Sequence, residues 1–260
     1  MYTTYWNLER KPFENTPDPD FFYLSPEHAE ALDRFAYLLG ERKGAGLLTG
    51  EYGCGKTTMV RVLGERLDLE QHRVAYLNYP RFSPDALLGE ILYQLGADAS
   101  GDNVARMHRL GEIFYRTSEE GGHTIIIVDE AQILPEGGVL EELRLLLNFQ
   151  LADAFLVTFL LVGQPELRER IMRLPPLDQR IAVRYHLHNF DLDNTRAYIA
   201  FRLDVAGADR ELFTEDAVEA IYARTFGTPR RINNVCDLCL FMGSRRKVEL
   251  ITDEIVQLVA

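Results

Sequence analysis

The chain has 260 residues, of which 47% are hydrophobic and 26% charged, which is ordinary for a globular protein with room for a full core. Its 40 acidic and 28 basic residues give a net charge of −12, which repels a polyanion over most of the surface and disfavours non-specific nucleic-acid binding. Three cysteines, an odd number, predict a reducing compartment without a disulfide framework, so we expect a cytoplasmic protein.

Neither a secretory leader nor a membrane span is expected. The first residues contain no apolar stretch of the needed length. The longest apolar region, 145–163, is interrupted by Asn148, Gln150 and Asp153. We therefore expect that region to divide into the end of a helix and a strand.

The first 36 residues predict an extended arm followed by a helix. Prolines alternate with aromatic residues over 10–25, a pattern typical of an extended segment that packs on a larger body. Ser25 and Pro26 then predict a helix that begins there and ends near Leu39. We expect residues 1–36 to pack on the core; the alternative is that an arm aromatic flanks an adenine.

Residues 50–57 read G-E-Y-G-C-G-K-T, between the apolar pair Leu47-Leu48 and a helical pattern over 56–68. This is the P-loop pattern, in which glycines let backbone N–H groups surround phosphate oxygens at a helix N-terminus. We expect Lys56 to reach the β- and γ-phosphates of ATP and Thr57 to offer its hydroxyl to Mg²⁺. The alternative is a glycine-rich turn. The expected nucleotide-binding residues are Gly50, Glu51, Tyr52, Gly53, Cys54, Gly55, Lys56, Thr57 and Thr58.

A second motif, a strand that ends in two acidic residues, follows the P-loop along the chain. Residues 73–78 predict a strand, Ser83 opens a helix that ends near 95, and another helix is expected over 103–119. The run 124–130 is then a β-branched strand that ends in Asp129 and Glu130. We expect Asp129 to bind Mg²⁺ and Glu130 to polarise the attacking water, the alternative being a solvated strand end.

The remaining pattern predicts two domains. A helix over 139–148 and strands over 155–162 and 182–188 complete an alternation of strands and helices, which predicts an α/β fold with a doubly wound parallel sheet over 37–189. Four helices, expected over 191–206, 214–225, 229–242 and 252–259, form a small all-helical domain at 190–260. Within it, Cys236 and Cys239 are interpreted as core packing rather than half of a zinc site.

This order of motifs resembles the AAA+ ATPases, a P-loop NTPase core followed by a helical lid. It is most similar to the ExeA-like ATPases of the general secretion pathway protein A family, which also group with transposition ATPases such as MuB and TniB. The segments that carry the resemblance are Pro12-Phe13, Thr16-Pro17-Asp18-Pro19, Tyr23 to His28, the P-loop, Asp129 to Gln132, Gly163 to Leu167, Asp178 to Ile181, and Gly227 to Asn233.

The resemblance implies roles for several polar residues. Gln164 takes the place of sensor 1, which helps to hold the attacking water, although it could instead cap the helix at Pro165. Arg180 takes the place of the arginine finger that enters the neighbouring subunit's site, with Arg184 as the second candidate. Arg230 matches sensor 2, with Arg231 as the alternative.

Asn78 resembles the polar residue that keeps the catalytic Glu130 away from water in many AAA+ proteins. Its alternative is a turn-forming asparagine before Tyr79 and Pro80.

The implied activity is Mg²⁺-dependent ATP hydrolysis by a ring-like or filamentous homo-oligomer that works on a bacterial envelope assembly, such as a secretion or pilus system. Its place would be the cytoplasm or, through a partner protein, the inner face of the membrane. One alternative is an ATPase that polymerises on DNA and hands a transposase its target, which the acidic balance opposes. A second is a nucleotide-binding switch or scaffold with little turnover. Family members usually continue into a membrane span and a periplasmic domain, so an excised domain or a short relative is expected.

Overall fold

The structure is a computed structural model that describes residues 2–16, 18–67, 71–78, 80–136, 138–152 and 154–259. Pro17, Tyr79 and Asp153, which enter the predictions above, lie outside these ranges. The chain forms two compact units. The helical unit contains Met1–His28, Glu51–Met59 and His188–Ala260, and the sheet unit contains Ala29–Gly50 and Val60–Leu187.

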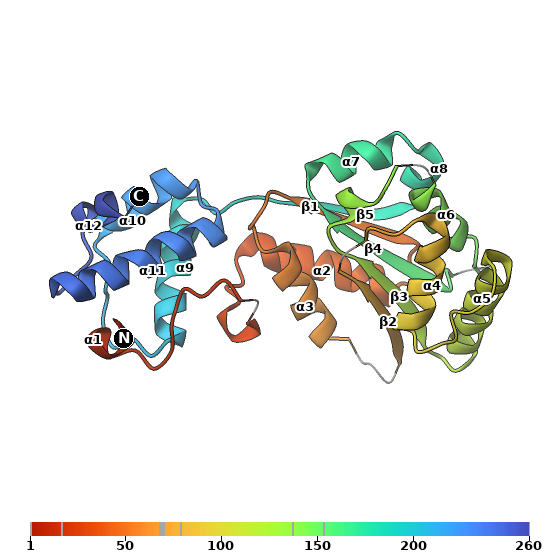
Figure 1. The fold of residues 1–260 in the computed structure, drawn as a ribbon, viewed down its shortest axis with the longest axis horizontal. Coiled ribbons are helices and arrows are strands. Elements are labelled where there is room, and N and C mark those ends of the chain that lie inside the picture. The colour runs from red at the N-terminus through yellow and green to blue at the C-terminus, as the bar shows by residue number, and fades with distance from the viewer. Residues whose placement is uncertain are drawn as a thin grey trace. The chain divides into compact units, whose positions relative to one another are not determined.

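The sheet unit is built on five parallel strands in the order β2-β3-β4-β1-β5 (Figure 1). They are β1 (Ala45–Gly50), β2 (His72–Leu77), β3 (His123–Val128), β4 (Val157–Gly163) and β5 (Ile181–Leu187). Every residue of β1, β3 and β4 is buried, which explains why these strands read as continuous apolar runs. β4 begins two residues later than expected because Phe155 pairs with Gln150 in an isolated antiparallel bridge.

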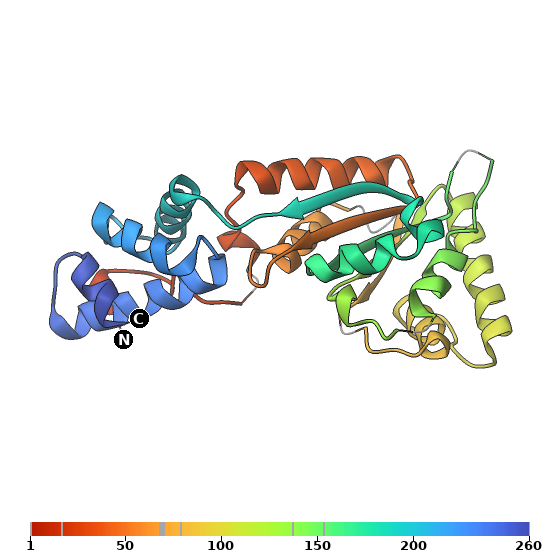
Figure 2. The same cartoon turned by 90° about the horizontal axis from the view of Figure 1, so that it is seen from above.

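Helices cover both faces of this sheet, as the alternating pattern predicts. On one face lies α2 (Pro26–Gly40), which is so close that a Cβ atom at Gly46 would lie 2.5 Å from Leu38 and 2.8 Å from Phe35. The other face packs against helices that share one apolar core: α4 (Pro84–Gln94), α5 (Asn103–Glu119), α6 (Val139–Leu146) and α7 (Pro165–Met172). Figure 2 shows α2 and α7 on opposite sides of the strands. The doubly wound parallel fold is confirmed.

The predicted helices of the sheet unit agree with the structure to within a few residues. α3 (Lys56–Glu65) follows the P-loop, and α4 begins at Ser83, whose hydroxyl accepts the backbone N–H of Ala86. Two short helices were not predicted, α1 (Tyr2–Trp6) and α8 (Pro175–Asp178), and α7 was considered only as the helix at Pro165 that Gln164 could cap. Two 3-10 turns, η1 (Pro19–Phe21) and η2 (Ala131–Ile133), complete the described elements.

The helical unit contains four longer helices in its C-terminal part, as expected. They are α9 (Leu192–Val205), α10 (Glu215–Thr225), α11 (Pro229–Arg246) and α12 (Asp253–Leu258). Cys236 and Cys239 are both fully buried in their common core, so the interpretation as packing residues is confirmed. Within the described ranges no group of three or more His, Cys, Asp or Glu residues could hold a metal ion.

The N-terminal arm packs on these helices within the helical unit. The indole of Trp6 is buried and donates a hydrogen bond to the Leu240 carbonyl at 2.8 Å. Phe13 and Phe21 belong to the same apolar cluster. Arg202 of α9 lies 4.5 Å from the Phe21 ring and donates to the Pro12 carbonyl. The short helices therefore complete their core with aromatic side chains from the arm.

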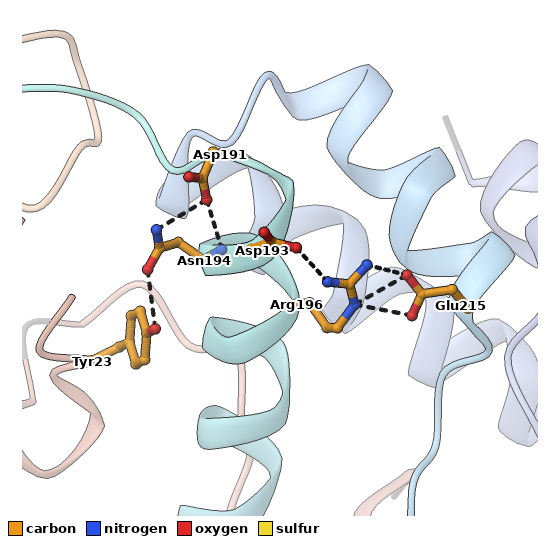
Figure 3. Close-up of polar contacts among 6 residues, drawn as sticks. All are labelled: Tyr23, Asp191, Asp193, Asn194, Arg196 and Glu215. Atoms are coloured by element: carbon orange, nitrogen blue, oxygen red, sulfur yellow. Dashed lines mark hydrogen bonds and ion pairs between the residues drawn. The ribbon is translucent and has the colours of Figure 1, made fainter. Parts of the chain in front are cut away.

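Polar contacts around the start of α9 support this packing (Figure 3). The Tyr23 hydroxyl donates to Asn194 Oδ1 at 3.2 Å, and the Asp191 carboxylate accepts the Asn194 backbone N–H at 2.8 Å as the N-cap. Arg196 pairs with Asp193 on its own helix and with Glu215 at the start of α10. These contacts connect the arm, α9 and α10.

A search of the described residues finds no helix that is both long and apolar enough to cross a bilayer.

The backbone at Gly227 leads to a prediction about the stability of the helical unit. Its φ is +69°, and a Cβ atom there would lie 1.7 Å from the Phe190 carbonyl oxygen, so Gly227→Ala adds a backbone clash to left-handed strain. Gly207, with φ +84°, meets only the Glu9 side chain, which can move. We expect Gly207→Ala to lower the free energy of unfolding by about 1–2 kcal/mol and Gly227→Ala by about 3 kcal/mol or more.

Denaturant titration followed by the fluorescence of Trp6, the single tryptophan, measures both variants in the unit that contains them. Equal losses for the two variants would contradict a rigid contact between Gly227 and Phe190.

Candidate nucleotide site

The predicted P-loop connects the end of β1 at Gly50 with the start of α3 at Lys56. Gly53 and Gly55 have φ values of +79° and +103°, which side chains of L-residues avoid, so glycine is needed at both turns. Lys56 is buried, and its Nζ donates a hydrogen bond to the Glu51 carbonyl at 2.8 Å. Thr57 follows in the first turn of α3, where backbone N–H groups have no helical acceptor.

His28 supports this loop from within the helical unit. Its Nδ1 lies 2.6 Å from the Ser25 hydroxyl oxygen, and a Cβ atom at Gly55 would lie 3.0 Å from its Nε2. Burial lowers the pKa of His28 to about 4, and a hydrogen bond with the Cys54 backbone opposes part of that shift. His28 is therefore neutral at pH 7 and packs beneath the turn of the loop.

Cys54 lies inside the loop but is a packing residue. It is fully buried, and burial raises the pKa of its thiol although the Lys56 charge opposes the rise. A buried thiol of raised pKa is a poor nucleophile.

Arg230 of α11 also reaches the P-loop within the helical unit. Its backbone N–H donates to the Gly53 carbonyl at 3.3 Å, and a Cβ atom at Gly53 would lie 2.7 Å from the Arg230 Cβ. Pro229 occupies the first turn of α11 and Thr228 its N-cap position, which starts the helix beside the loop. Of the two candidates for sensor 2, the structure thus brings Arg230 to the loop, whereas the exposed Arg231 has no such contact among the described residues.

Asp129 follows β3 in the sheet unit and is almost fully buried. Its Oδ2 accepts the Tyr76 hydroxyl at 2.9 Å, and its Oδ1 accepts the Glu130 backbone N–H at 2.9 Å. Burial, followed by the Asp129 charge, raises the pKa of Tyr76, so the phenol stays protonated and donates. Tyr76 was not among the predicted site residues; the signal available was its position two residues before the end of the strand expected over 73–78.

The side chain of Glu130 is held by Gln132. Gln132 Nε2 donates to Glu130 Oε2 at 2.6 Å, and Gln132 Oε1 accepts the Gln164 backbone N–H at 3.1 Å. Asn78, which the resemblance implied as the partner of Glu130, is exposed and makes no such bond in the described structure. The structure therefore brings Glu130, Gln132 and Gln164 together and leaves Asn78 outside this group.

Gln164 combines a buried side chain with an amide donor that is unpaired in the described part of the chain, which favours a bound ligand or water at this position. Its side chain is only 4% exposed, and its Nε2 has no hydrogen-bond partner among the described residues. Gln164 occupies the N-cap position of α7, but its side chain makes no capping hydrogen bond there. Because an unmet buried donor costs about 1–3 kcal/mol, an acceptor such as a phosphate oxygen or a water is expected there.

The two finger candidates differ in their partners. Arg180 donates to the neutral side-chain oxygen of Asn148 at 2.8 Å and to the Pro176 carbonyl. Arg184 forms an ion pair with Asp178 at 2.8 Å and also donates to its carbonyl. Arg184 thus forms an ion pair with a carboxylate, whereas the hydrogen bonds of Arg180 go to neutral oxygens. A hydrogen bond from Arg144 lowers the pKa of the Glu141 carboxyl, and the charge of Arg180 adds to this effect only at longer range.

The sequence of this chain matches a known protein family and a known relative. The family described as AAA domain matches residues 39–171. The general secretion pathway protein A of Aeromonas hydrophila is 37% identical over 95% of this chain. The chain spans 45% of the length of that relative.

Solved structures share the fold at lower identity. A chain of Drosophila ORC bound to DNA has a TM-score of 0.72 and 19% identity and covers 96% of this chain, which spans 64% of that one. The Aeropyrum pernix ORC1 protein in complex with DNA has a TM-score of 0.72 and 22% identity, with coverage of 96% and 68%.

The low pKa of His28 predicts how stability depends on pH. The folded state holds this imidazole neutral down to about pH 4, whereas the unfolded chain protonates near pH 6.5. The contribution of neutral His28 to the free energy of unfolding is therefore complete above pH 6.5. It is lost as the pH falls towards 4, by up to about 1.4 kcal/mol per pH unit. His28→Gln should remove this part of the slope, measured by Trp6 fluorescence in denaturant.

His123 provides the matched control, because burial also lowers its pKa to about 4 but it belongs to the sheet unit. His123→Gln should leave the slope reported by Trp6 unchanged. A His28→Gln variant with the wild-type slope would mean that His28 titrates as in the unfolded chain.

Proposed function

Because the chain belongs to the AAA domain family, we propose that it binds and hydrolyses ATP with Mg²⁺. The observation that carries the proposal is the form of the P-loop: two glycines with positive φ precede the buried Lys56 at the first residue of a helix. Backbone N–H groups at such a helix start favour phosphate groups. Residues 50–58 would hold the triphosphate, and Lys56 would contact its β- and γ-phosphates.

The donor set fits Mg²⁺, which takes few protein ligands and prefers oxygen. Thr57 offers a hydroxyl at the start of α3, and Asp129 offers a buried carboxylate at the end of β3. When bound, the ion neutralises charge that develops on the phosphate oxygens. The Tyr76 hydroxyl holds Oδ2 of Asp129 and so fixes the direction of the carboxylate.

Glu130 is proposed to orient the attacking water and accept its proton, and the unmet amide donor of Gln164 to hold that water or the γ-phosphate. Arg230, beside Gly53, is proposed to connect the lid helices with the nucleotide state. Arg180 is proposed as the finger for a neighbouring copy, because it forms no ion pair within the described ranges and its hydrogen bonds go to neutral oxygens. A homo-oligomer follows from that role.

The biological work proposed is at a bacterial envelope assembly, of the secretion or pilus type. The likeness to general secretion pathway protein A over 95% of the chain supports it. A DNA-directed role, such as target selection in transposition, is opposed by the net charge of −12. The proposed place is the inner side of the membrane, reached through a partner protein.

Glu130→Gln tests the chemistry. The variant keeps the shape of the side chain but loses the proton acceptor, so we expect ATP affinity within about twofold of wild type and turnover at least about 10²-fold slower. Phosphate release and equilibrium binding of a fluorescent ATP analogue measure the two quantities. Lys56→Ala, the companion variant, should abolish binding. Unchanged turnover in Glu130→Gln would refute the role of Glu130, and tight binding in Lys56→Ala would refute that of the P-loop.

A mixture of two inactive variants tests whether sites are shared. An interface between an Arg180→Ala subunit and a Glu130→Gln subunit can contain one intact Glu130 and one intact Arg180, so mixing should restore part of the ATPase activity. Arg184→Ala alone is the control and should remain active without a partner variant, since Arg184 is paired with Asp178. Absence of rescue over a range of ratios would contradict a finger acting in trans.

A further inference from the structure

We propose that Gln132 is a positioning residue for Glu130, whose carboxylate it holds in a fixed orientation relative to the backbone of Gln164. This inference rests on the proposed ATPase function and names a residue to which no motif assigned a role. All the groups involved belong to the sheet unit, near the carboxyl ends of β3 and β4.

The side-chain amide of Gln132 is engaged at both ends. Its Nε2 donates to Glu130 Oε2 at 2.6 Å, and its Oε1 accepts the Gln164 N–H at 3.1 Å. Rotation of the amide would break both bonds, and a hydrogen bond to an ionised carboxylate is among the stronger ones in proteins. The carboxylate of Glu130 and the backbone of the sensor position are thereby kept in one arrangement.

The backbone of Gln132 is fixed in turn. Arg170 of α7 donates to the Gln132 carbonyl at 2.6 Å and to the Pro135 carbonyl at 3.4 Å. A Cβ atom at Gly163 would lie 2.6 Å from Gln132 Oε1, so a larger residue there would displace the amide from its present position. Residues from β4 and α7 therefore define where the amide of Gln132 can lie.

The turn at Glu130 makes the contact possible. Glu130 has φ +52° and ψ +35°, a left-handed conformation that is uncommon for a residue other than glycine. Through this turn the side chains of residues 130 and 132 meet although they are only two residues apart. Strained backbone of this kind persists where the surrounding contacts over-determine it, as the contacts of Gln132 and Arg170 do here.

The arrangement leaves one oxygen of the carboxylate open. Oε2 of Glu130 is occupied by Gln132, while Oε1 accepts no hydrogen bond within the part of the chain that the structure describes. A general base needs one oriented lone pair within reach of a water. Gln132 supplies the orientation and Oε1 remains available for the proton.

The test separates catalysis from binding. Gln132→Ala should lower kcat by about 10- to 100-fold, the equivalent of one charge-assisted hydrogen bond, with nucleotide affinity within twofold of wild type. Gln94→Ala is the matched control, because Gln94 Nε2 donates to Glu90 Oε1 at 2.9 Å on the exposed surface of α4. It should leave both quantities unchanged.

A double-mutant cycle asks whether Gln132 acts through Glu130. In the Glu130→Gln background, where no carboxylate remains to be oriented, Gln132→Ala should reduce turnover by less than about threefold. Gln132→Glu keeps the acceptor for the Gln164 N–H but places a second carboxylate beside Glu130, and it should be at least as slow as Gln132→Ala. This variant also provides the measurement if the alanine variant does not fold.

The outcomes are distinct. Wild-type turnover in Gln132→Ala or Gln132→Glu, an equal loss with and without the Glu130 carboxylate, or a matching loss of nucleotide affinity would each overturn the role of Gln132. An inactive wild type, or a Glu130→Gln variant at full speed, would instead overturn the proposed ATPase function. A slow Glu130→Gln variant together with a fast Gln132→Ala variant would refute the positioning role alone.

Discussion

The hydrogen-bonded register of the parallel strands is the constraint on which the proposed chemistry of the sheet unit depends. Val128 pairs with Leu161, and Leu48 pairs with Val162, so β1, β3 and β4 end close to one level. The chain leaves the sheet there towards the P-loop, Asp129 and Gln164. Because carboxyl ends of parallel strands form the ligand edge of such sheets, the pairing of these buried strands determines where the polar groups that follow them lie.

Burying these polar groups costs desolvation free energy, which hydrogen bonds from neighbouring residues offset. An ionised carboxylate without partners is far too costly to bury, and the Tyr76 hydroxyl and the Glu130 N–H provide Asp129 with two donors. Gln164 differs from Asp129 in this respect. Its backbone N–H donates to Gln132 Oε1, but its side-chain Nε2 has no acceptor within the described ranges. The site thus combines groups that already have hydrogen-bond partners with one amide donor that has none among the described residues.

The sequence was sufficient for features that depend on local chemistry. Continuous apolar runs, the cap at Ser83 and the glycines of the P-loop predicted the strands, the longer helices and the nucleotide motif. The contacts of Tyr76 and Gln132 were missed because they depend on strand pairing and on the left-handed turn at Glu130, and neither leaves a periodic pattern. The resemblance offered Asn78 as a partner of Glu130, with a turn-forming role as the alternative, and only tertiary structure shows that its side chain is exposed.

The extent of the short helices and the surface that the arm covers were not predicted, for a related reason. α7 and α8 have eight and four residues, too few for a helical period to stand out, although each has a proline in its first turn. The aromatic residues of the arm marked it as a packing segment, but composition alone does not select between two apolar surfaces. The domain ranges 1–36, 37–189 and 190–260 remain predictions, and the compact units divide the chain differently.

The place of Trp6 affects how any shortened version of this protein behaves. Its indole ring packs against α11, where a Cβ atom at Gly243 would lie 2.8 Å from the ring. The indole N–H donates a hydrogen bond to the Leu240 carbonyl. Segments from opposite ends of the chain therefore form one folding body. A protease that cuts after the arm, or an expression design that starts at the first strand, would leave the C-terminal helices with a void lined by apolar side chains and prone to self-association.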